Sequence, residues 1–398
     1  MSLLADVCEV FADGDWVESK DQAQAGIRLI QTGNVGIGAF KGRDEKTRYV
    51  SDDTFNRLRC TEIFEGDCLI SRLPEPAGRS CIVPATGERM ITAVDCTIVR
   101  FRPRQVLPGF FNYYSQSLDY LQAVDSETTG TTRKRISRSK LGQVAIPVPP
   151  VPEQQRIVGV LDEAFAAIAT ARANTEQNLR NARELLGAAT ESLFPAVTQG
   201  QAGARTLAEL CDLIVDCEHK TAPTQEEGIP SIRTPNIGKG RLILDDVHRV
   251  SDDTYRAWTR RVEPKAGDLI LAREAPAGNV AVIPDGLKVC LGQRTVLLRP
   301  DRSVFEPAYL AHLLLQRDSQ RRLLAGQRGA TVQHVNVQDI RAFRVSGVPS
   351  LVVQQGVVQK IDTLLEAGDA LEAGFQQKLA ALDALKQSLL HQAFTGAL

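Results

Sequence analysis

The sequence predicts an α+β protein in which two mixed α/β domains are joined by two long antiparallel helices that form a coiled-coil rod. Two observations support this prediction: segments of the first half return about 200 residues later, and each half ends in a long amphipathic helix. A chain of 398 residues suits two to three domains. We therefore expect a pseudo-two-fold internal duplication, with domains at residues 1–150 and 205–349 and conserved long helices at 151–204 and 350–398.

The internal repeat consists of short matching segments in the same order. The sequence VSDDT at residues 50–54 returns at 250–254, and PAG at 76–78 returns at 276–278. Solenoid repeats have periods of roughly 20–50 residues, so the longer spacing here indicates a duplicated domain pair. Such a pair suggests recognition of a target that itself has two halves.

The first long helix is predicted after the proline-rich stretch 147–152, because proline fits neither a central strand nor a helix interior. From Glu153 to about Phe194, apolar residues recur every three or four positions, which predicts a helix roughly 60 Å long with one apolar stripe. The stripe contains Ile157, Leu161, Ala164, Ile168, Ala171, Thr175, Leu179, Ala182, Leu186, Ala189 and Leu193.

The second long helix is expected to start near Val353 and to carry a stripe of similar length and phase. Gly356, Gly368 and Gly374 should weaken it, each by about 1 kcal/mol relative to alanine. A long helix with one narrow stripe needs a partner, so we expect the two helices to pair antiparallel. The alternative is that each helix folds back on its own domain. The second stripe contains Val357, Ile361, Leu364, Leu371, Phe375, Leu379, Leu382, Leu389 and Ala393.

The composition is that of an ordinary globular protein, with 43% hydrophobic and 24% charged residues. No run of about 18 apolar residues and no secretory pattern is present, so a cytoplasmic protein without membrane contact is expected. The eight cysteines form no C-x-x-C pair and should be buried, reduced thiols rather than zinc ligands.

The net charge of −1 argues by itself against a nucleic-acid partner. Basic residues nevertheless concentrate at 133–140 and at 317–328, so local basic faces are compatible with a neutral total. A solvated charged face also explains such clusters, and charge alone favours that interpretation.

No catalytic or cofactor-binding motif is present. The sequence lacks G-x-S-x-G, H-E-x-x-H and the P-loop, and it also lacks the Asn/Asp-Pro-Pro-Tyr/Phe motif of amino-methyltransferases. The five histidines are scattered along the chain. The sequence therefore predicts a non-catalytic binding subunit without a cofactor or metal of its own. Two alternatives are a structural adaptor, whose helical rod links two protein-binding domains, and an enzyme with an unrecognised site.

Several segments resemble the specificity subunit of type I restriction-modification systems. The join at residues 147–158, PVPPVPEQQRIV, resembles the family's boundary between recognition domain and conserved helix. The second join departs from this pattern, with Val353 and Gly356 in place of Glu153 and Arg156. The other segments with a family resemblance are 13–16 with 31–36, 216–223 with 232–237, and the chain end at 385–396.

The resemblance implies two target recognition domains, each reading one half of a bipartite, asymmetric double-stranded DNA site. It implies that the helical pair sets the spacer and docks methylase subunits, of which two are expected. Adenine methylation with S-adenosylmethionine, and DNA cleavage with ATP and Mg, would belong to methylase and restriction/translocase subunits. The DNA sequence, the spacer length and the presence of a restriction subunit stay open at this point.

Candidate DNA contacts are polar residues at matching positions of the two copies, because arginine reads guanine and amides read adenine in the major groove. The leading candidates are Arg133, Lys134 and Arg135, which suit phosphate contacts as well as base contacts. For any single candidate, a turn or core hydrogen bond is an equal alternative. The full set is Thr32, Asn34, Arg72, Thr132, Arg133, Lys134, Arg135, Thr234, Asn236, Arg273, Thr331, Gln333 and His334.

Overall fold

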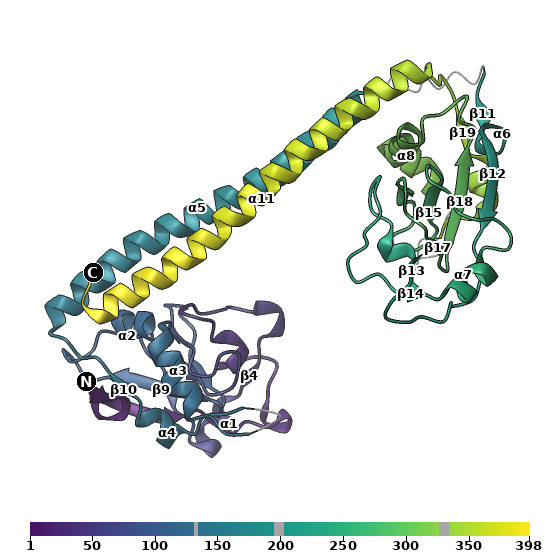
Figure 1. Ribbon diagram of the computed structural model, residues 1–398. Helices are drawn as coiled ribbons and strands as arrows, with labels where there is room; N and C mark the ends of the chain where they lie inside the picture. Colours follow the sequence, from purple (N-terminus) through teal and green to yellow (C-terminus); the bar gives the residue numbers. More distant parts are fainter. Residues whose placement is uncertain (131–133, 195–202, 326–333) are drawn as a thin grey trace. The chain divides into compact units, whose positions relative to one another are not determined.

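The computed structural model describes residues 1–130, 134–194, 203–325 and 334–398 (Figure 1). The chain divides into two compact units, Met1–Gln177 with Phe375–Leu398 and Asn178–Gly374. Each unit holds one mixed α/β domain together with a segment of each long helix. Thr132, Arg133, Thr331 and Gln333, which the sequence proposed as DNA contacts, lie outside the described residues.

The first domain is built on an antiparallel sheet of four strands in the order β2-β9-β6-β7. A smaller sheet, β4-β3-β8-β5, contains the parallel pair β3 and β8. Phe110, Phe111 and Tyr120, which lie on two of the helices, pack against the larger sheet. The strands are β2 (Cys8–Asp13), β3 (Ile27–Ile30), β4 (Tyr49–Val50), β5 (Glu62–Ile63), β6 (Cys68–Ser71), β7 (Ser80–Ile82), β8 (Met90–Thr92) and β9 (Cys96–Phe101). The helices are α1 (Asp52–Leu58), α2 (Pro108–Tyr114), α3 (Leu118–Ser126) and α4 (Arg138–Gly142).

The second domain repeats this topology with a four-stranded sheet in the order β12-β18-β15-β16. A three-stranded sheet, β14-β13-β17, again contains one parallel pair, β13 and β17. The strands are β12 (Cys211–Asp216), β13 (Ile229–Ile232), β14 (Arg249–Val250), β15 (Leu269–Ala272), β16 (Val280–Val282), β17 (Cys290–Leu291) and β18 (Thr295–Pro300). The helices are α6 (Leu207–Leu210), α7 (Asp252–Trp258), α8 (Pro307–Leu315), α9 (Arg317–Leu324) and α10 (Val337–Ala342). The predicted duplication and fold class are confirmed.

The repeated VSDDT segments start a helix in both copies. The hydroxyl of Ser51 accepts a hydrogen bond from the backbone N–H of Thr54 (3.1 Å) and caps α1. Ser251 and Thr254 make the same cap at α7 (3.2 Å). A serine at this position satisfies a backbone donor that the first helical turn leaves free. The repetition of the motif in the two copies therefore has a structural cause.

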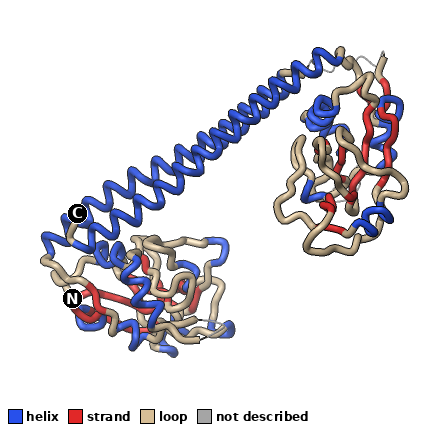
Figure 2. Tube along the Cα trace, viewed as in Figure 1, coloured by secondary structure: helices blue, strands red, loops and turns tan. Residues whose placement is uncertain are grey.

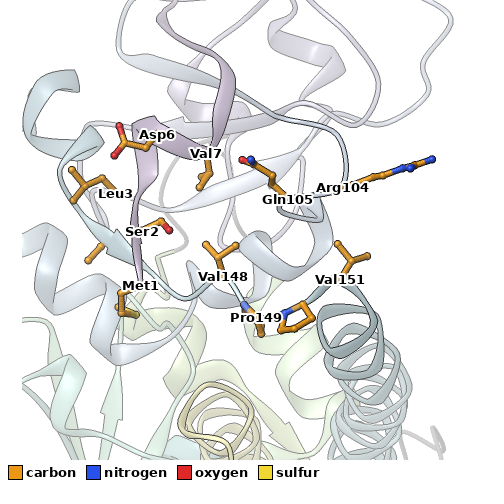
Figure 3. A pocket seen from close by; sticks show the side chains of 12 residues that line it. Met1, Ser2, Leu3, Asp6, Val7, Arg104, Gln105, Val148, Pro149 and Val151 are labelled. Carbon is orange, nitrogen blue, oxygen red and sulfur yellow. The ribbon is translucent and has the colours of Figure 1, made fainter.

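The start of each domain pairs with its end. In the first domain β1 (Ser2–Leu3) pairs antiparallel with β10 (Ala145–Ile146), and in the second β11 (Arg205–Thr206) pairs with β19 (Arg344–Val345). Each domain is thereby closed where its long helix begins. A hollow of about 820 Å³ lies at this join in the first domain, between the N-terminal residues and the prolines that precede the helix (Figure 3).

The long helices are α5 (Val151–Ser192) and α11 (Leu351–Thr395), and they pair antiparallel in both units (Figure 2). In the first unit Arg172 forms an ion pair with Asp383 at 2.6 Å. In the second unit Arg183 pairs with Glu372. The predicted stripe of α5 faces its partner, since most of its members are buried or half-buried. The paired helices are therefore confirmed.

One residue of the second stripe was placed wrongly. Leu371 was expected in the seam, the contact surface between α5 and α11, but its side chain is 54% exposed. The neighbouring Gly368 lies in the seam instead, because a Cβ atom on it would lie 2.6 Å from Cδ2 of Leu186. The glycine therefore allows close approach of the two helices at this point, which periodicity alone does not reveal.

A buried glutamine fastens each long helix to its domain. Gln154 is 0% exposed; its Oε1 accepts a hydrogen bond from the N–H of Leu107 (2.8 Å), and its Nε2 donates to the carbonyls of Gln105 and Pro149 (both 2.8 Å). Gln354 makes the equivalent three bonds in the second unit, to Glu306 N, Val304 O and Pro349 O. The first glutamine of each repeated Gln-Gln pair thus joins helix and domain.

Glu153 and Arg156, which have no counterparts in the second join, do not take part in this glutamine anchor. Both side chains are exposed, and they form an ion pair at 2.7 Å while Arg156 also donates to the carbonyl of Leu398 (3.0 Å). An exposed pair of this kind contributes little to stability. Its replacement in the second copy therefore leaves the glutamine anchor intact.

All eight cysteines are buried and free, as expected. Burial raises the pKa of the Cys8 thiol to about 12, so this group stays protonated and behaves as a small apolar side chain. Across the described residues, no helix is long and apolar enough to span a membrane. In the same part of the chain, no group of three or more His, Cys, Asp or Glu side chains is arranged to hold a metal ion.

Candidate nucleic-acid interface

Three loops meet at one edge of each domain. In the first domain these are residues 31–43 after β3, 72–79 after β6 and 134–137 before α4. In the second domain the equivalent loops are 233–243 and 273–279, with residues 334–336 before α10. We call each set the loop cluster of its domain, and all nine described candidate DNA contacts lie in these two clusters.

The candidate asparagines hold the first loop of each cluster. Asn34 is 8% exposed, its Oδ1 accepts from Gln31 N (2.9 Å), and its Nδ2 donates to the carbonyls of Lys41 (2.8 Å) and Gly42 (3.1 Å). Asn236 repeats this arrangement with Arg233 N and Ile243 O in the second domain. These bonds give both amides an internal role, and direct adenine contact by either stays a prediction.

Thr32 and Thr234 open the short 3₁₀ turns that the asparagines close, Thr32–Asn34 and Thr234–Asn236. Thr234 is buried and Thr32 is half-buried. DNA contact by the threonine side chains also stays a prediction.

Arg72 lies inside the first loop cluster and is 4% exposed. Its guanidinium donates to the carbonyl of Val94 and lies 3.4 Å from the carboxylate of Asp13. Burial lowers the pKa of this guanidinium, but arginine stays protonated in proteins. The carbonyl of Arg72 accepts from Ile136 N (3.2 Å), so the residue ties β6 to the third loop.

Arg273 has the same place in the second domain and a more complete set of partners. Its Nη1 contacts both carboxylate oxygens of Asp216 (3.1 and 3.0 Å), and its Nε donates to Val335 O (3.0 Å). Its Nη2 lies 2.8 Å from Nε2 of His334. Because arginine only donates, Nε2 must accept, and Nδ1 of His334 then donates to Glu274 (2.8 Å). His334 is thereby fixed in orientation.

The basic side chains Lys134 and Arg135 are exposed but ion-paired. Lys134 lies 3.2 Å from Asp125, and Arg135 lies 2.8 Å from Asp95. Arg135 also exchanges two backbone hydrogen bonds with Thr129 (both 2.9 Å). Surface pairs of this strength break easily when a stronger counter-ion arrives, so both side chains remain available to phosphate.

Arg79, which is not among the candidates selected from sequence, joins the first two loops. Its guanidinium donates to four carbonyls, those of Thr32 (2.9 Å), Val35 (2.7 Å), Leu73 (2.7 Å) and Pro76 (3.0 Å). In the second domain Asn279 stands at this position of the repeat, and its Nδ2 donates to Ile237 O (2.9 Å). The position of Arg79 directly after the repeated PAG segment is the signal in the sequence that could have marked this residue.

Known proteins are similar to this chain in sequence and in fold. A family model described as the type I restriction modification DNA specificity domain matches residues 1–179. The chain is 21% identical over 345 residues to the type I restriction enzyme EcoBI specificity subunit of Escherichia coli, covering 80% of this chain and 70% of that protein. It is 22% identical over 321 residues to the EcoKI specificity subunit of Escherichia coli (strain K12), covering 75% and 67%.

Solved structures match over the whole chain. One was solved in work on the complex assembly and conformational transition of the type I R-M system; it has a TM-score of 0.78, 18% identity and coverage of 100% of this chain and 97% of that one. The HsdS subunit from Thermoanaerobacter tengcongensis has a TM-score of 0.59, 19% identity and coverage of 100% and 96%. At these identities the matches show the fold.

Duplicated α/β domains on paired helices, with a cluster of loops at one edge of each domain, are the fold that this chain shares with these solved structures. Residues 1–179 match the model of the type I restriction modification DNA specificity domain, and the chain is similar to the specificity subunits of type I restriction enzymes.

Proposed function

We propose that each recognition domain reads one half of a bipartite DNA site through its loop cluster. The observation that carries this proposal is that the loop clusters of the two domains have similar backbone arrangements but present different side chains. The third loop offers Lys134 and Arg135 in the first domain and His334 in the second, while Arg72 and Arg273 occupy the same structural position. Two loop clusters with similar backbones but different side chains suit two different half-sites related by a pseudo-two-fold axis.

We also propose that the helical pair sets the spacer and docks two methylase subunits. Supporting this, the long helices expose large apolar side chains in both units: Val160 and Leu385 in the first, Leu185 and Leu371 in the second. Leu185 and Leu371 line a mostly apolar hollow of about 240 Å³. Exposed apolar patches on a helix commonly mark sites where another protein binds.

The reactions are assigned to the partner subunits. S-adenosylmethionine would bind the methylase subunits, and ATP and Mg would bind restriction/translocase subunits where these accompany the complex. This chain would contribute recognition and spacing alone. The solved relative's assembly within a type I R-M system supports the existence of such partners for proteins of this fold.

The proposal is tested by expressing the chain with its methylase subunit in a host that lacks adenine methylation, and sequencing the methylome. We expect a split, asymmetric motif with a fixed spacer. The purified chain alone should bind no S-adenosylmethionine in calorimetry. A continuous palindromic motif would contradict two-domain reading, and a chain that binds methylase but no DNA would favour the alternative of a structural adaptor.

A further inference from the structure

We propose that a basic loop of the first recognition domain, residues 41–48, binds backbone phosphates of the DNA, and that the second domain lacks this contact. The inference rests on the proposed DNA-binding function. It adds a phosphate site at residues that the sequence analysis did not select.

The loop borders a polar hollow of about 350 Å³ beside the first loop cluster. Its lining consists of Gln31, Asn34, Arg43, Lys46, Thr47 and Arg48. Half of these six residues are cations, and the hollow lies next to the Thr32–Asn34 turn. A concave site lined by cations, the Gln31 amide and the Thr47 hydroxyl matches a phosphate group, which needs hydrogen-bond donors as well as positive charge.

The basic side chains of this loop form no ion pair with an acidic side chain in the described part of the chain. Lys41, Arg43, Lys46 and Arg48 are exposed, and none forms an ion pair with any residue that the structure describes. The acids of the segment are Asp44 and Glu45, and Asp44 is already paired with Arg28 at 3.0 Å. The leading candidates from sequence, Lys134 and Arg135, are both ion-paired. The loop is therefore the stronger source of unneutralised positive charge.

The backbone of the loop is held in place. Asn34 donates to the carbonyls of Lys41 and Gly42, and it accepts from Lys41 N at its own carbonyl (2.8 Å). The buried Arg28 donates to Gly42 O (2.7 Å) and to Asp44. Because the backbone is fixed before DNA arrives, little ordering entropy is lost on binding. This explains why an asparagine in the recognition loop makes only internal bonds.

Gly33 determines where the Arg43 guanidinium lies. A Cβ atom on Gly33 would lie 1.7 Å from Nη1 of Arg43, so the guanidinium packs directly over the backbone of the turn. Any larger residue would displace this charge without removing it. Since the clash is with the end of a flexible side chain, the fold can accommodate it by moving that side chain alone.

The second domain has a different surface at the equivalent position. Asn236 bonds to Ile243 O as Asn34 bonds to Lys41 O, so Ile243 replaces Lys41. Ile243 and Leu244 are exposed, and Asp245 and Asp246 follow them. The nearby Arg241 is paired with Asp369 at 3.1 Å. Aspartates in this place would repel phosphate, so the contact belongs to the first half-site alone.

The test measures DNA affinity of the full chain, in complex with its methylase subunits, across a salt series. The variants Arg43→Gln, Lys46→Gln and Arg48→Gln neutralise one charge each and retain polar side chains. We expect the slope of log affinity against log salt to become shallower by about one unit per variant and about three for the triple variant. Affinity for specific and unrelated duplexes should fall alike, and the methylated sequence should stay unchanged.

Two matched variants make the result decisive. Arg59→Gln removes an exposed arginine of the same domain that, like Arg43, has a left-handed backbone (φ 54° and 52°), and it should leave the slope unchanged. Gly33→Ala keeps every charge but displaces Arg43, and it should weaken affinity as Arg43→Gln does.

The outcomes separate this inference from the proposed function. If the wild-type complex binds no duplex at low salt, the proposed function fails and the phosphate site fails with it. If wild type binds but the triple variant keeps its slope, only the phosphate site is overturned. It is also overturned if Arg59→Gln flattens the slope equally, or if the variants lose affinity at a single base pair.

Discussion

At the scale of single residues, buried polar side chains fix the backbone that carries the recognition loops. Asn34, Arg79 and Gln154 each bond to several backbone groups from different parts of the first unit. Their counterparts Asn236, Asn279 and Gln354 do the same in the second unit. Buried polar groups with complete sets of partners specify one arrangement, because any alternative leaves donors or acceptors unpaired.

Gln154→Ala should destabilise the first unit strongly. The substitution leaves one N–H and two carbonyls without their buried partner, so we expect a loss of about 2–5 kcal/mol in the free energy of unfolding. The neighbouring Gln155 is exposed, and Gln155→Ala should change stability by less than about 0.5 kcal/mol. Chemical denaturation of both variants provides the measurement, and equal stabilities would show that the glutamine does not anchor the helix.

The sequence alone predicted which residue types occur in the loop clusters better than it predicted the directions in which their side chains point. Arginine and asparagine at repeated positions were selected as candidate DNA contacts, but Arg72 and Asn34 point into the domain. A side chain's direction depends on loop conformation, which residue type does not determine. The ion pairs of Lys134 and Arg135 join residues far apart in the chain or in another element, so they too were invisible before the fold was known.

At the scale of elements, the paired helices were the most predictable part. Period and proline boundaries placed the start of each helix within two residues of the observed Val151 and Leu351. Leu371 was misplaced because periodicity assumes a uniform distance between the helices. The small Gly368 lets Leu186 approach closely, and the seam passes beside Leu371.

The three glycines of α11 should respond differently to alanine. A Cβ atom added at Gly356 or Gly374 would meet no atom within 4 Å, so Gly374→Ala should stabilise the helix by up to about 1 kcal/mol. Gly368→Ala should lose this gain, because the new methyl group meets Leu186 and overpacking costs about 1–3 kcal/mol. Thermal denaturation compares the variants. A stabilising Gly368→Ala would show that the helices do not approach closely there.

Aspartate substitutions should distinguish buried positions of the long helices from exposed ones. Leu161 is fully buried, so Leu161→Asp places an unpaired charge in an apolar site and should cost several kcal/mol. Leu371→Asp changes an exposed residue and should leave the folded state near wild-type stability, while weakening methylase binding if the apolar hollow docks that subunit. Melting temperature and co-purification are measured together. If the Leu371→Asp variant failed to fold, this would indicate that Leu371 is buried between the two helices.

At the scale of the whole molecule, the duplication makes each recognition domain a closed part. Both ends of the first domain pair with each other through β1 and β10, so removing residues 1–147 cuts no strand pairing with the rest of the described chain. The anchor Gln154 bonds to the backbone of Gln105 and Leu107, and any domain with the same backbone can supply these groups. Side-chain contacts across the junction include Phe110 and Tyr114, which both pack edge-on against Phe394, and Tyr113, which packs edge-on against Phe165.

Exchanging residues 1–147 for the first domain of another family member should therefore change one half of the methylated motif. The other half and the spacer length should stay the same, because the second domain and both helices are untouched. The incoming domain should keep aromatic residues at the positions of Phe110 and Tyr114, since without them the domain would lose its packing on Phe394 and the experiment would report misfolding. Methylome sequencing reads both halves at once. The reciprocal exchange, of residues 205–349, should alter only the other half, and a change in both halves after either exchange would show that the two domains read DNA jointly.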